Sequence, residues 1–203
     1  MSWTKEELLE QIKMRPSVII ELGCGPNPPQ NIIGIDHINL PGVHFVTDLE
    51  QGLGMIPNNS IDEVHSSHFM EHIQNFEGLI KDIHRILKPE GKNIVVVPHF
   101  ANPHYYSDYT HKRFFGLYTF DYFSRPENQL ARKVPAFYTD VKFKVVKRKF
   151  VFKTPEFPIL NFFNRWILQP VFNANAFMQE LYEGTFCWIF PCRELVFEMI
   201  PEK

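Results

Sequence analysis

Seven of the nine histidines lie between residues 65 and 111, in a stretch that also carries carboxylates. His99 directly follows an apolar run, and His104, Asp108 and His111 come after it at short spacings. An imidazole positioned by a carboxylate is a common general base in enzymes that remove a proton from a substrate. This pattern predicts an acid–base site with His99 or His111 as the base and Asp108 orienting the imidazole.

The same residues allow two other interpretations. They could hydrogen-bond the backbone of their own loop and close a pocket. They could also bind a metal ion, because His99, His104, Asp108 and His111 are all suitable ligand types. Their spacing matches no known metal motif, and no metal site is predicted.

A second group of residues is typical of a site for a nucleoside-containing ligand. Glu21-Leu22-Gly23-Cys24-Gly25 ends an apolar run, and glycines in such a turn let the backbone approach a ligand closely. Asp36 ends a second run, where a carboxylate can accept from both hydroxyls of a ribose. Asp48 ends a third, in a position to accept from an exocyclic amine. Their order predicts a binding edge in an open α/β sheet.

The elements that must position these residues alternate between strand and helix. Thr4 and Glu7 form a capping box for a helix that ends before Arg15-Pro16. A second helix begins after Asn75 and stops at Pro89-Glu90-Gly91. Strands are expected over 17–22, 31–36, 43–48, 61–66, 93–97, 141–152 and 194–200, with two short helices within 155–190. Alternation of this kind predicts an open, mostly parallel sheet.

With these elements in place, the chain resembles a known family. ELGCG, GID, TDLE, IDEVHSSHFMEHI and ILKPEG, in this order over residues 17–98, look like the class I S-adenosylmethionine-dependent methyltransferases. PHFANPHYYSDYTHKRFF also resembles a subgroup of prokaryotic members without an assigned substrate. The resemblance implies a Rossmann-like α/β fold: a seven-stranded mixed sheet with helices on both faces and an antiparallel last strand.

The resemblance also implies a cofactor, S-adenosyl-L-methionine, which leaves as S-adenosyl-L-homocysteine. The glycine turn would face the methionine and ribose, Asp36 the ribose hydroxyls, Asp48 and Leu49 the adenine, and the end of the fourth strand the sulfonium. The cofactor-binding residues that follow are Glu21, Gly23, Cys24, Gly25, Asp36, His37, Asp48, Leu49, Ser66, Ser67 and His68. Only five and six residues, 26–30 and 37–42, are available for crossovers near strands 2 and 3, so the sheet is expected to be trimmed there.

A nicotinamide-dependent dehydrogenase is the nearest competitor. Its turn needs a third glycine and a following helix whose N-terminus faces a pyrophosphate, whereas residue 28 here is proline and no helix is available. S-adenosylmethionine carries no phosphate, which favours the methyltransferase. The predicted activity is methyl transfer to an O or N of a small, partly apolar acceptor. The alternative is a non-catalytic cofactor-binding protein that acts through an aromatic surface.

The aromatic residues are unevenly distributed. Of the 30, 25 lie after residue 100, and many of them fall in an expected insertion over 155–193. We therefore expect one domain over 1–203, with a cofactor-binding half (1–98) and a substrate-side half (99–203). The insertion could cover a hydrophobic small molecule or form a homodimer contact.

Charge and cysteine content limit the remaining partners. The net charge is −2, and the lysines of 142–153 alternate with apolar residues as on the wet face of an edge strand, so nucleic acid is not an expected partner. Three cysteines suggest no disulfide framework, and the longest uncharged run near the C-terminus, 166–179, is too short and polar to span a bilayer. These features predict a soluble cytoplasmic protein.

Overall fold

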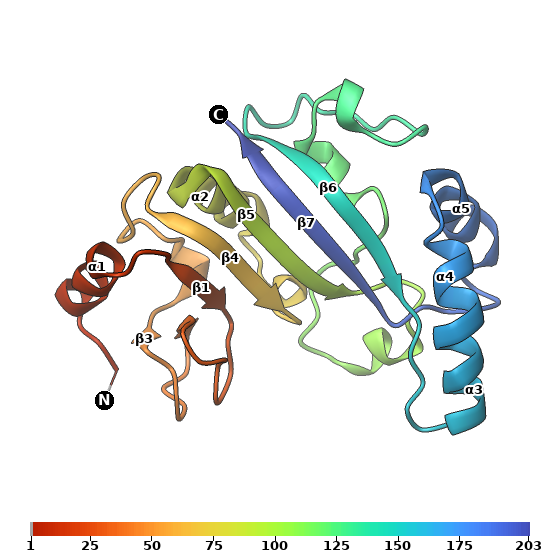
Figure 1. Cartoon of the computed structure of the whole chain (residues 1–203), viewed down its shortest axis with the longest axis horizontal. Helices are drawn as coiled ribbons and strands as arrows, with labels where there is room; N and C mark the ends of the chain where they lie inside the picture. The colour runs from red at the N-terminus through yellow and green to blue at the C-terminus, as the bar shows by residue number, and fades with distance from the viewer. Residues whose placement is uncertain (1) are drawn as a thin grey trace.

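The computed structural model describes residues 2–203 and is built around one seven-stranded sheet (Figure 1). Strands β1 (Ile19–Leu22), β2 (Ile33–Asp36), β3 (Phe45–Val46), β4 (Ile61–Ser67) and β5 (Leu87–Pro98) pair in parallel. Strand β7 (Glu194–Glu202) lies antiparallel between β5 and β6 (Lys142–Val151), in the order β3-β2-β1-β4-β5-β7-β6. The predicted mixed sheet with an antiparallel last strand is confirmed.

The sheet is trimmed at one edge, as the short crossovers predicted. Within residues 2–203, no helix connects β1 to β2 or β2 to β3, and β3 is only two residues long. The edge is held instead by local hydrogen bonds, such as the one from the Gly34 amide to His44 Nδ1 at 3.0 Å. Because the order reverses between β1 and β4, the carboxyl ends of these strands form a crevice at the topological switch point.

The two predicted N-terminal helices form where their caps and apolar spacing place them. Helix α1 (Lys5–Met14) starts at Thr4, whose hydroxyl accepts from the Glu7 amide at 3.2 Å while Glu7 accepts from the Thr4 amide at 2.7 Å. Helix α2 (Phe76–Ile86) buries a continuous apolar stripe. Strand β5 begins directly after it and is longer than predicted, because Leu87 pairs with Ile61 and a bulge between Ile61 and Glu63 accommodates Pro89.

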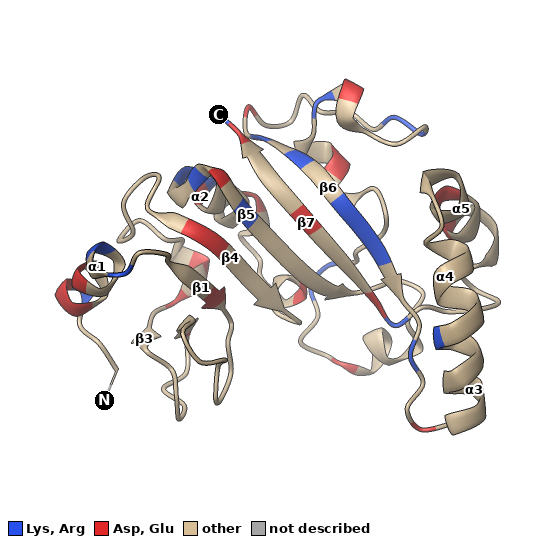
Figure 2. Ribbon diagram, in the orientation of Figure 1, with Lys and Arg blue, Asp and Glu red and all other residues tan. Residues whose placement is uncertain are grey.

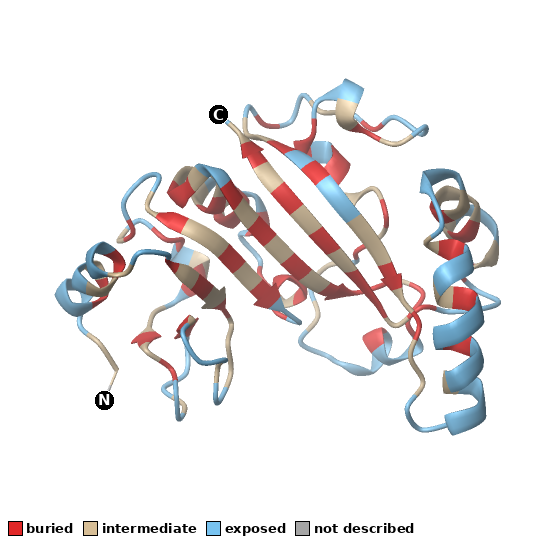
Figure 3. Cartoon of the chain, viewed as in Figure 1, coloured by how far each residue is buried: buried red, intermediate tan, exposed pale blue. Residues whose placement is uncertain are grey.

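The two faces of the sheet are covered unequally (Figures 1 and 3). On the face packed against α2, Leu22, Val64, Val95 and Phe197 are fully buried. Their neighbours along each strand point to the other face and are only half-buried, so red and tan alternate along β4, β5 and β7 in Figure 3. On this second face, the centre of the sheet carries no helix within the described residues.

The expected insertion lies between β6 and β7 and packs beside the edge strand β6. It contains α3 (Pro158–Phe163), α4 (Gln169–Phe172) and α5 (Ala176–Leu181), with wider π-helical turns over 164–168 and 182–186. Residues 158–172 therefore form one continuous helical stretch. No helix in the described part of the chain is long and apolar enough to cross a membrane.

Candidate functional site

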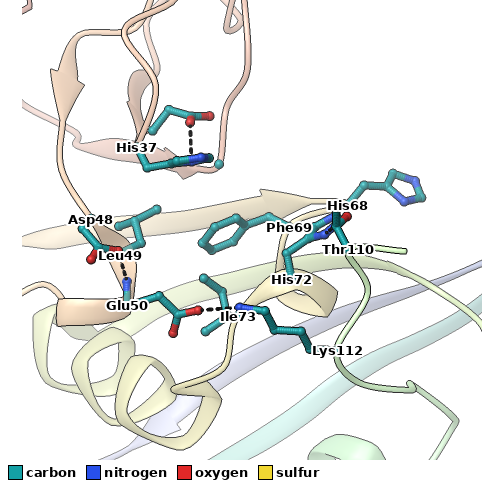
Figure 4. A pocket seen from close by; sticks show the side chains of 12 residues that line it. His37, Asp48, Leu49, Glu50, His68, Phe69, His72, Ile73, Thr110 and Lys112 are labelled. Carbon is teal, nitrogen blue, oxygen red and sulfur yellow. Dashed lines mark hydrogen bonds and ion pairs between the residues drawn. The ribbon is translucent and has the colours of Figure 1, made fainter. Parts of the chain in front are cut away.

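A cavity of about 550 Å³ opens at the carboxyl ends of β1, β2 and β4 (Figure 4). It brings together six of the eleven residues predicted to bind the cofactor and adds others that the sequence did not single out. The predicted ones are Gly23, Asp36, His37, Asp48, Leu49 and His68; the added ones include Glu50, Phe69, His72, Ile73, Thr110 and Lys112.

Gly23 is required by close packing at the base of this cavity. Its φ of +64° lies in the left-handed region, and a Cβ there would overlap the ring of Phe69. Phe69 and Ile73 are nearly buried and, with Leu49, give the cavity an apolar side. A planar base fits against such side chains.

Asp36 is held in a fixed orientation at the end of β2. Its Oδ2 accepts from the Gly25 amide at 2.9 Å, and its Oδ1 accepts from the Ile38 amide at 3.1 Å. His37 Nδ1 lies 3.1 Å from Oδ1 (Figure 4). A carboxylate has about four acceptor positions, so capacity remains for a ribose hydroxyl. These residues fit the ribose and adenine portions of S-adenosylmethionine.

Five predicted cofactor residues do not line the cavity: Glu21, Cys24, Gly25, Ser66 and Ser67. Gly25 acts through its amide on Asp36, and the Cys24 thiol donates to the Gly25 carbonyl. Ser66 is buried, with its hydroxyl unbonded to any described residue, and Ser67 is exposed at the end of β4.

His68 is strained and charged. It follows β4 with a φ of +52°, a conformation that is uncommon outside glycine and that clusters at functional sites. Its Nε2 lies 3.0 Å from Glu194 Oε1, and its Nδ1 lies 3.4 Å from Glu71 Oε1. The hydrogen bond to Glu194, followed by the interaction with Glu71, raises the pKa of His68 to about 9. His68 is therefore an imidazolium at neutral pH.

A second, polar pocket of about 490 Å³ shares His68 and His72 with the first. Its lining adds, among others, Glu71, Tyr105, Asp108, His111, Lys153 and Glu194, with Pro98 and Pro155 on its apolar side. Glu71 is completely buried, and neither of its oxygens accepts a hydrogen bond from the described residues. A buried carboxylate without hydrogen bonds is costly to maintain, which is typical of a functional group.

The imidazole of His72 is oriented through Thr110. The Thr110 hydroxyl donates to Asp108 Oδ1 at 2.6 Å, so its oxygen must accept from His72 Nδ1, which lies 2.9 Å away. His72 therefore carries its proton on Nδ1 and has a free lone pair on Nε2. Asp108, which the sequence analysis paired with His99 or His111, contacts the imidazole of His72 through this hydroxyl.

His111 is held by a backbone carbonyl and faces two carboxylates. Its Nδ1 donates to the Tyr105 carbonyl at 3.0 Å, and its Nε2 lies 3.5 Å from Asp108 Oδ2 and 4.0 Å from Glu71 Oε1. Ligand atoms of Glu71, His72 and His111 all lie within 4.8 Å of one another. Two imidazoles and a buried carboxylate thus converge at the junction of the two pockets.

His99 cannot serve as the predicted base. Its side chain has no exposed surface, its Nδ1 accepts from the Ala101 amide at 3.1 Å, and its Nε2 faces Glu183 at 3.2 Å. Its Nδ1 is bonded within the loop after β5, and its Nε2 ties that loop to Glu183 of the insertion. The prediction placed His99 at the sheet edge because it follows β5, but its side chain turns into the core.

The most informative residues that sequence reasoning missed are Glu71, His72 and Thr110. For Glu71 and His72 the sequence did contain a signal, because His68 and His72 are four residues apart directly after β4. Helix-like spacing of this kind brings both imidazoles to one side of a turn, and the short 3-10 helix over 70–72 does so here. Thr110 had no independent signal, since its role depends on a contact across 38 residues.

Comparisons with known proteins agree with this fold. A family model described as a methyltransferase domain matches residues 4–134. The YcgJ protein from Bacillus subtilis is 12% identical, with a TM-score of 0.54 over 98% of this chain and 97% of that one. A SAM-dependent methyltransferase from Archaeoglobus fulgidus is 16% identical, with a TM-score of 0.53 over 98% and 95%. No curated protein is similar enough in sequence to count as a match.

The chain belongs to the methyltransferase-domain family, because the family model covers more than half of it. The seven-stranded mixed sheet is that of the class I fold predicted from the sequence. The protein is an S-adenosylmethionine-dependent methyltransferase.

Proposed function

We propose that the protein transfers a methyl group to a hydroxyl oxygen of a small acceptor held in the polar pocket. S-adenosylmethionine, when bound, supplies an electrophilic methyl group on a sulfonium. The supporting observation is the convergence of the His72 and His111 imidazoles beside Glu71, where the two pockets meet. A hydroxyl acceptor must lose a proton during transfer, whereas a neutral amine can react without a base.

The His72–His111 pair would remove this proton. His72 lines both pockets and has its tautomer set by Asp108 and Thr110, while His111 faces the acceptor side. Charge on a newly protonated imidazole would be balanced by Glu71 and Asp108. Tyr105, Pro98 and Pro155 suit an acceptor that is apolar on one side.

The roles that the sequence analysis assigned to the two halves of the chain are part of this proposal. Residues 1–98 would hold the cofactor, with Glu21, Cys24, Gly25, Ser66 and Ser67 acting indirectly, and residues 99–203 would supply most of the acceptor side. The cytoplasmic location inferred from the cysteine content also belongs to the proposal; all three cysteines are free thiols.

The cofactor site is tested by calorimetric titration with S-adenosylhomocysteine. We expect micromolar binding that is lost in Asp36→Ala and kept in Asp140→Ala, which removes an exposed carboxylate elsewhere. Binding of NAD in place of S-adenosylhomocysteine would contradict the assignment.

The acceptor class is tested by measuring S-adenosylhomocysteine release with panels of small alcohols, phenols and amines. We expect turnover of hydroxyl compounds, and a loss of kcat of about 100-fold or more in His72→Asn or His111→Asn. Cofactor binding should be unchanged in His111→Asn, because His111 does not line the cofactor cavity. Activity that survives EDTA would support the imidazole base, whereas loss on chelation and rescue by a divalent cation would assign Glu71, His72 and His111 to a metal. Turnover of amines alone would refute the proposal, and cofactor binding without any turnover would support the non-catalytic alternative.

A further inference from the structure

The insertion exposes a large apolar area to solvent. Twelve of the 21 exposed large hydrophobic side chains in residues 2–203 fall between residues 157 and 190, including Ile159 at 89% and Trp166 at 70% exposure. We call these twelve residues the aromatic surface: Phe157, Ile159, Leu160, Phe162, Phe163, Trp166, Ile167, Val171, Phe177, Trp188, Ile189 and Phe190. Phe157, Ile159, Leu160 and Phe163 line one apolar groove, and an exposed apolar area of this kind marks an interaction site.

The helical stretch 158–172 turns its polar side chains toward the protein. Asn161 accepts from the Thr154 amide at 3.0 Å, and Gln169 accepts from the Phe152 amide at 3.1 Å. Just beyond, Asn173 both accepts from the Phe150 amide at 2.8 Å and donates to the Phe150 carbonyl at 2.9 Å. Asn173 thus occupies free backbone groups of edge strand β6, and Asn161 and Gln169 bond the segment that follows it, so the polar side of the helix is used internally.

Unpaired cations border the aromatic surface. Lys144, Lys147 and Lys149 on β6, and Arg165 on the helical stretch, make no ion pair with any residue of 2–203. Lys147, Lys149, Arg165 and Trp166 line one groove, and Figure 2 shows the basic stripe along β6 facing the helices of the insertion. The carboxylates of the insertion are already engaged: Glu156 with Arg193, Glu180 with Tyr118, and Glu183 with His99.

We infer that the aromatic surface docks the protein onto a lipid bilayer that contains anionic headgroups. Tryptophan and phenylalanine beside lysine and arginine are the combination that partitions into a bilayer interface, with apolar side chains below the headgroups and cations among them. The helical stretch is 15 residues long, so it would lie in the plane of the interface.

The charge of the aromatic surface and its border favours an anionic bilayer over a second copy of the chain as the partner. A two-fold contact uses the same patch on both copies. It would bring four unpaired cations from each copy together, with no unengaged carboxylate of the insertion to meet them. An anionic bilayer surface supplies the missing charge.

The inference does not depend on the methyl acceptor and is tested without it. The full chain is sedimented with vesicles of phosphatidylcholine, with and without phosphatidylglycerol. We expect binding to the anionic vesicles that weakens with salt, because the cations act through screened attraction. The triple variant Ile159→Ser, Phe162→Ser, Trp166→Ser should lower partitioning about tenfold or more.

Matched controls distinguish binding through the aromatic surface from non-specific binding to vesicles. Phe137→Ser removes an exposed aromatic residue outside the insertion and should leave binding unchanged. Arg165→Glu with Lys147→Glu should abolish the preference for anionic vesicles, and Lys13→Glu on α1 should keep it. Each variant is first shown to bind S-adenosylhomocysteine as the wild type does, so a misfolded variant is recognised.

Two results would overturn the inference. One is absence of sedimentation with anionic vesicles while the wild type binds S-adenosylhomocysteine. The other is a dimer in solution that the triple variant converts to a monomer, because a second copy of the chain would then cover the aromatic surface.

Discussion

Helix α2 and the helical stretch 158–172 bury opposite kinds of side chain. Helix α2 turns Leu79, Ile80 and Ile83 into the core and leaves Lys81 outside. The stretch 158–172 turns Asn161, Asn164 and Gln169 toward the protein and leaves Ile159, Phe162 and Trp166 outside, apart from the buried Leu168 and Phe172. The burial of α2 is completed within this chain, whereas the apolar side of the second helix has no partner within residues 2–203.

The largest effect should come from comparing one isoleucine in each helix. Ile83→Ala removes a fully buried side chain, and we expect it to lower the free energy of unfolding by about 2–5 kcal/mol through lost packing and a cavity. Ile159→Ala removes a side chain that touches mainly water, so a change within about 0.5 kcal/mol is expected. Urea denaturation of both variants measures the difference. A large loss of stability in Ile159→Ala in dilute solution would mean that its surface is already covered.

The next comparison concerns the polar residue at each helix. Asn173→Ala leaves the amide and carbonyl of Phe150 on β6 without partners, at an expected cost of about 1–3 kcal/mol. Lys81→Ala removes a half-exposed ion pair with Glu77, worth roughly 0–0.5 kcal/mol. Unfolding curves of the two variants test this order. Equal costs would show that water hydrogen-bonds the amide and carbonyl of Phe150 in the Asn173→Ala variant.

The contrast also explains how far the sequence could predict the fold. Helix α2 and the strands were predictable because their apolar residues recur with the period of the element that buries them. The helices of the insertion were predictable as helices, but which side faces the protein was not. A run such as PILNFFNRWILQPVF has apolar residues all round, and the inward side is decided by where β6 leaves backbone groups unpaired.

The candidate site also has a part that the sequence could predict and a part that it could not. Gly23, Asp36 and Asp48 were predictable because local chain order alone places them at strand ends. The base was harder to find, because His99 and His72 both follow strands, and only tertiary contacts distinguish them. His99 is fixed in the core by Glu183, 84 residues away, whereas His72 is held at the pocket by Thr110. Contacts across such separations leave no periodic pattern in the sequence.

The smallest expected effect concerns His68, whose charge depends on the carboxylates beside it. The pKa of His68 is raised from 6.5 to about 9, mainly by Glu194 and then by Glu71. A raised pKa in the folded state contributes stability that is fully present below pH 6.5 and is lost as pH rises through about 9. Because His68 is 46% exposed, we expect only about 1 kcal/mol after solvent screening.

His68→Asn removes the titrating group while keeping a residue that tolerates a positive φ. Stability is measured by urea denaturation across this pH range for both proteins. The wild type should lose about 1 kcal/mol relative to the variant between the two ends of the range, because only the wild type releases a proton from this position. Parallel pH profiles would show that folding does not raise the pKa of His68, which would then be mostly neutral above pH 6.5. Glu71 would then be a buried carboxylate with no cation beside it, and the site would have to provide its counter-charge in some other form.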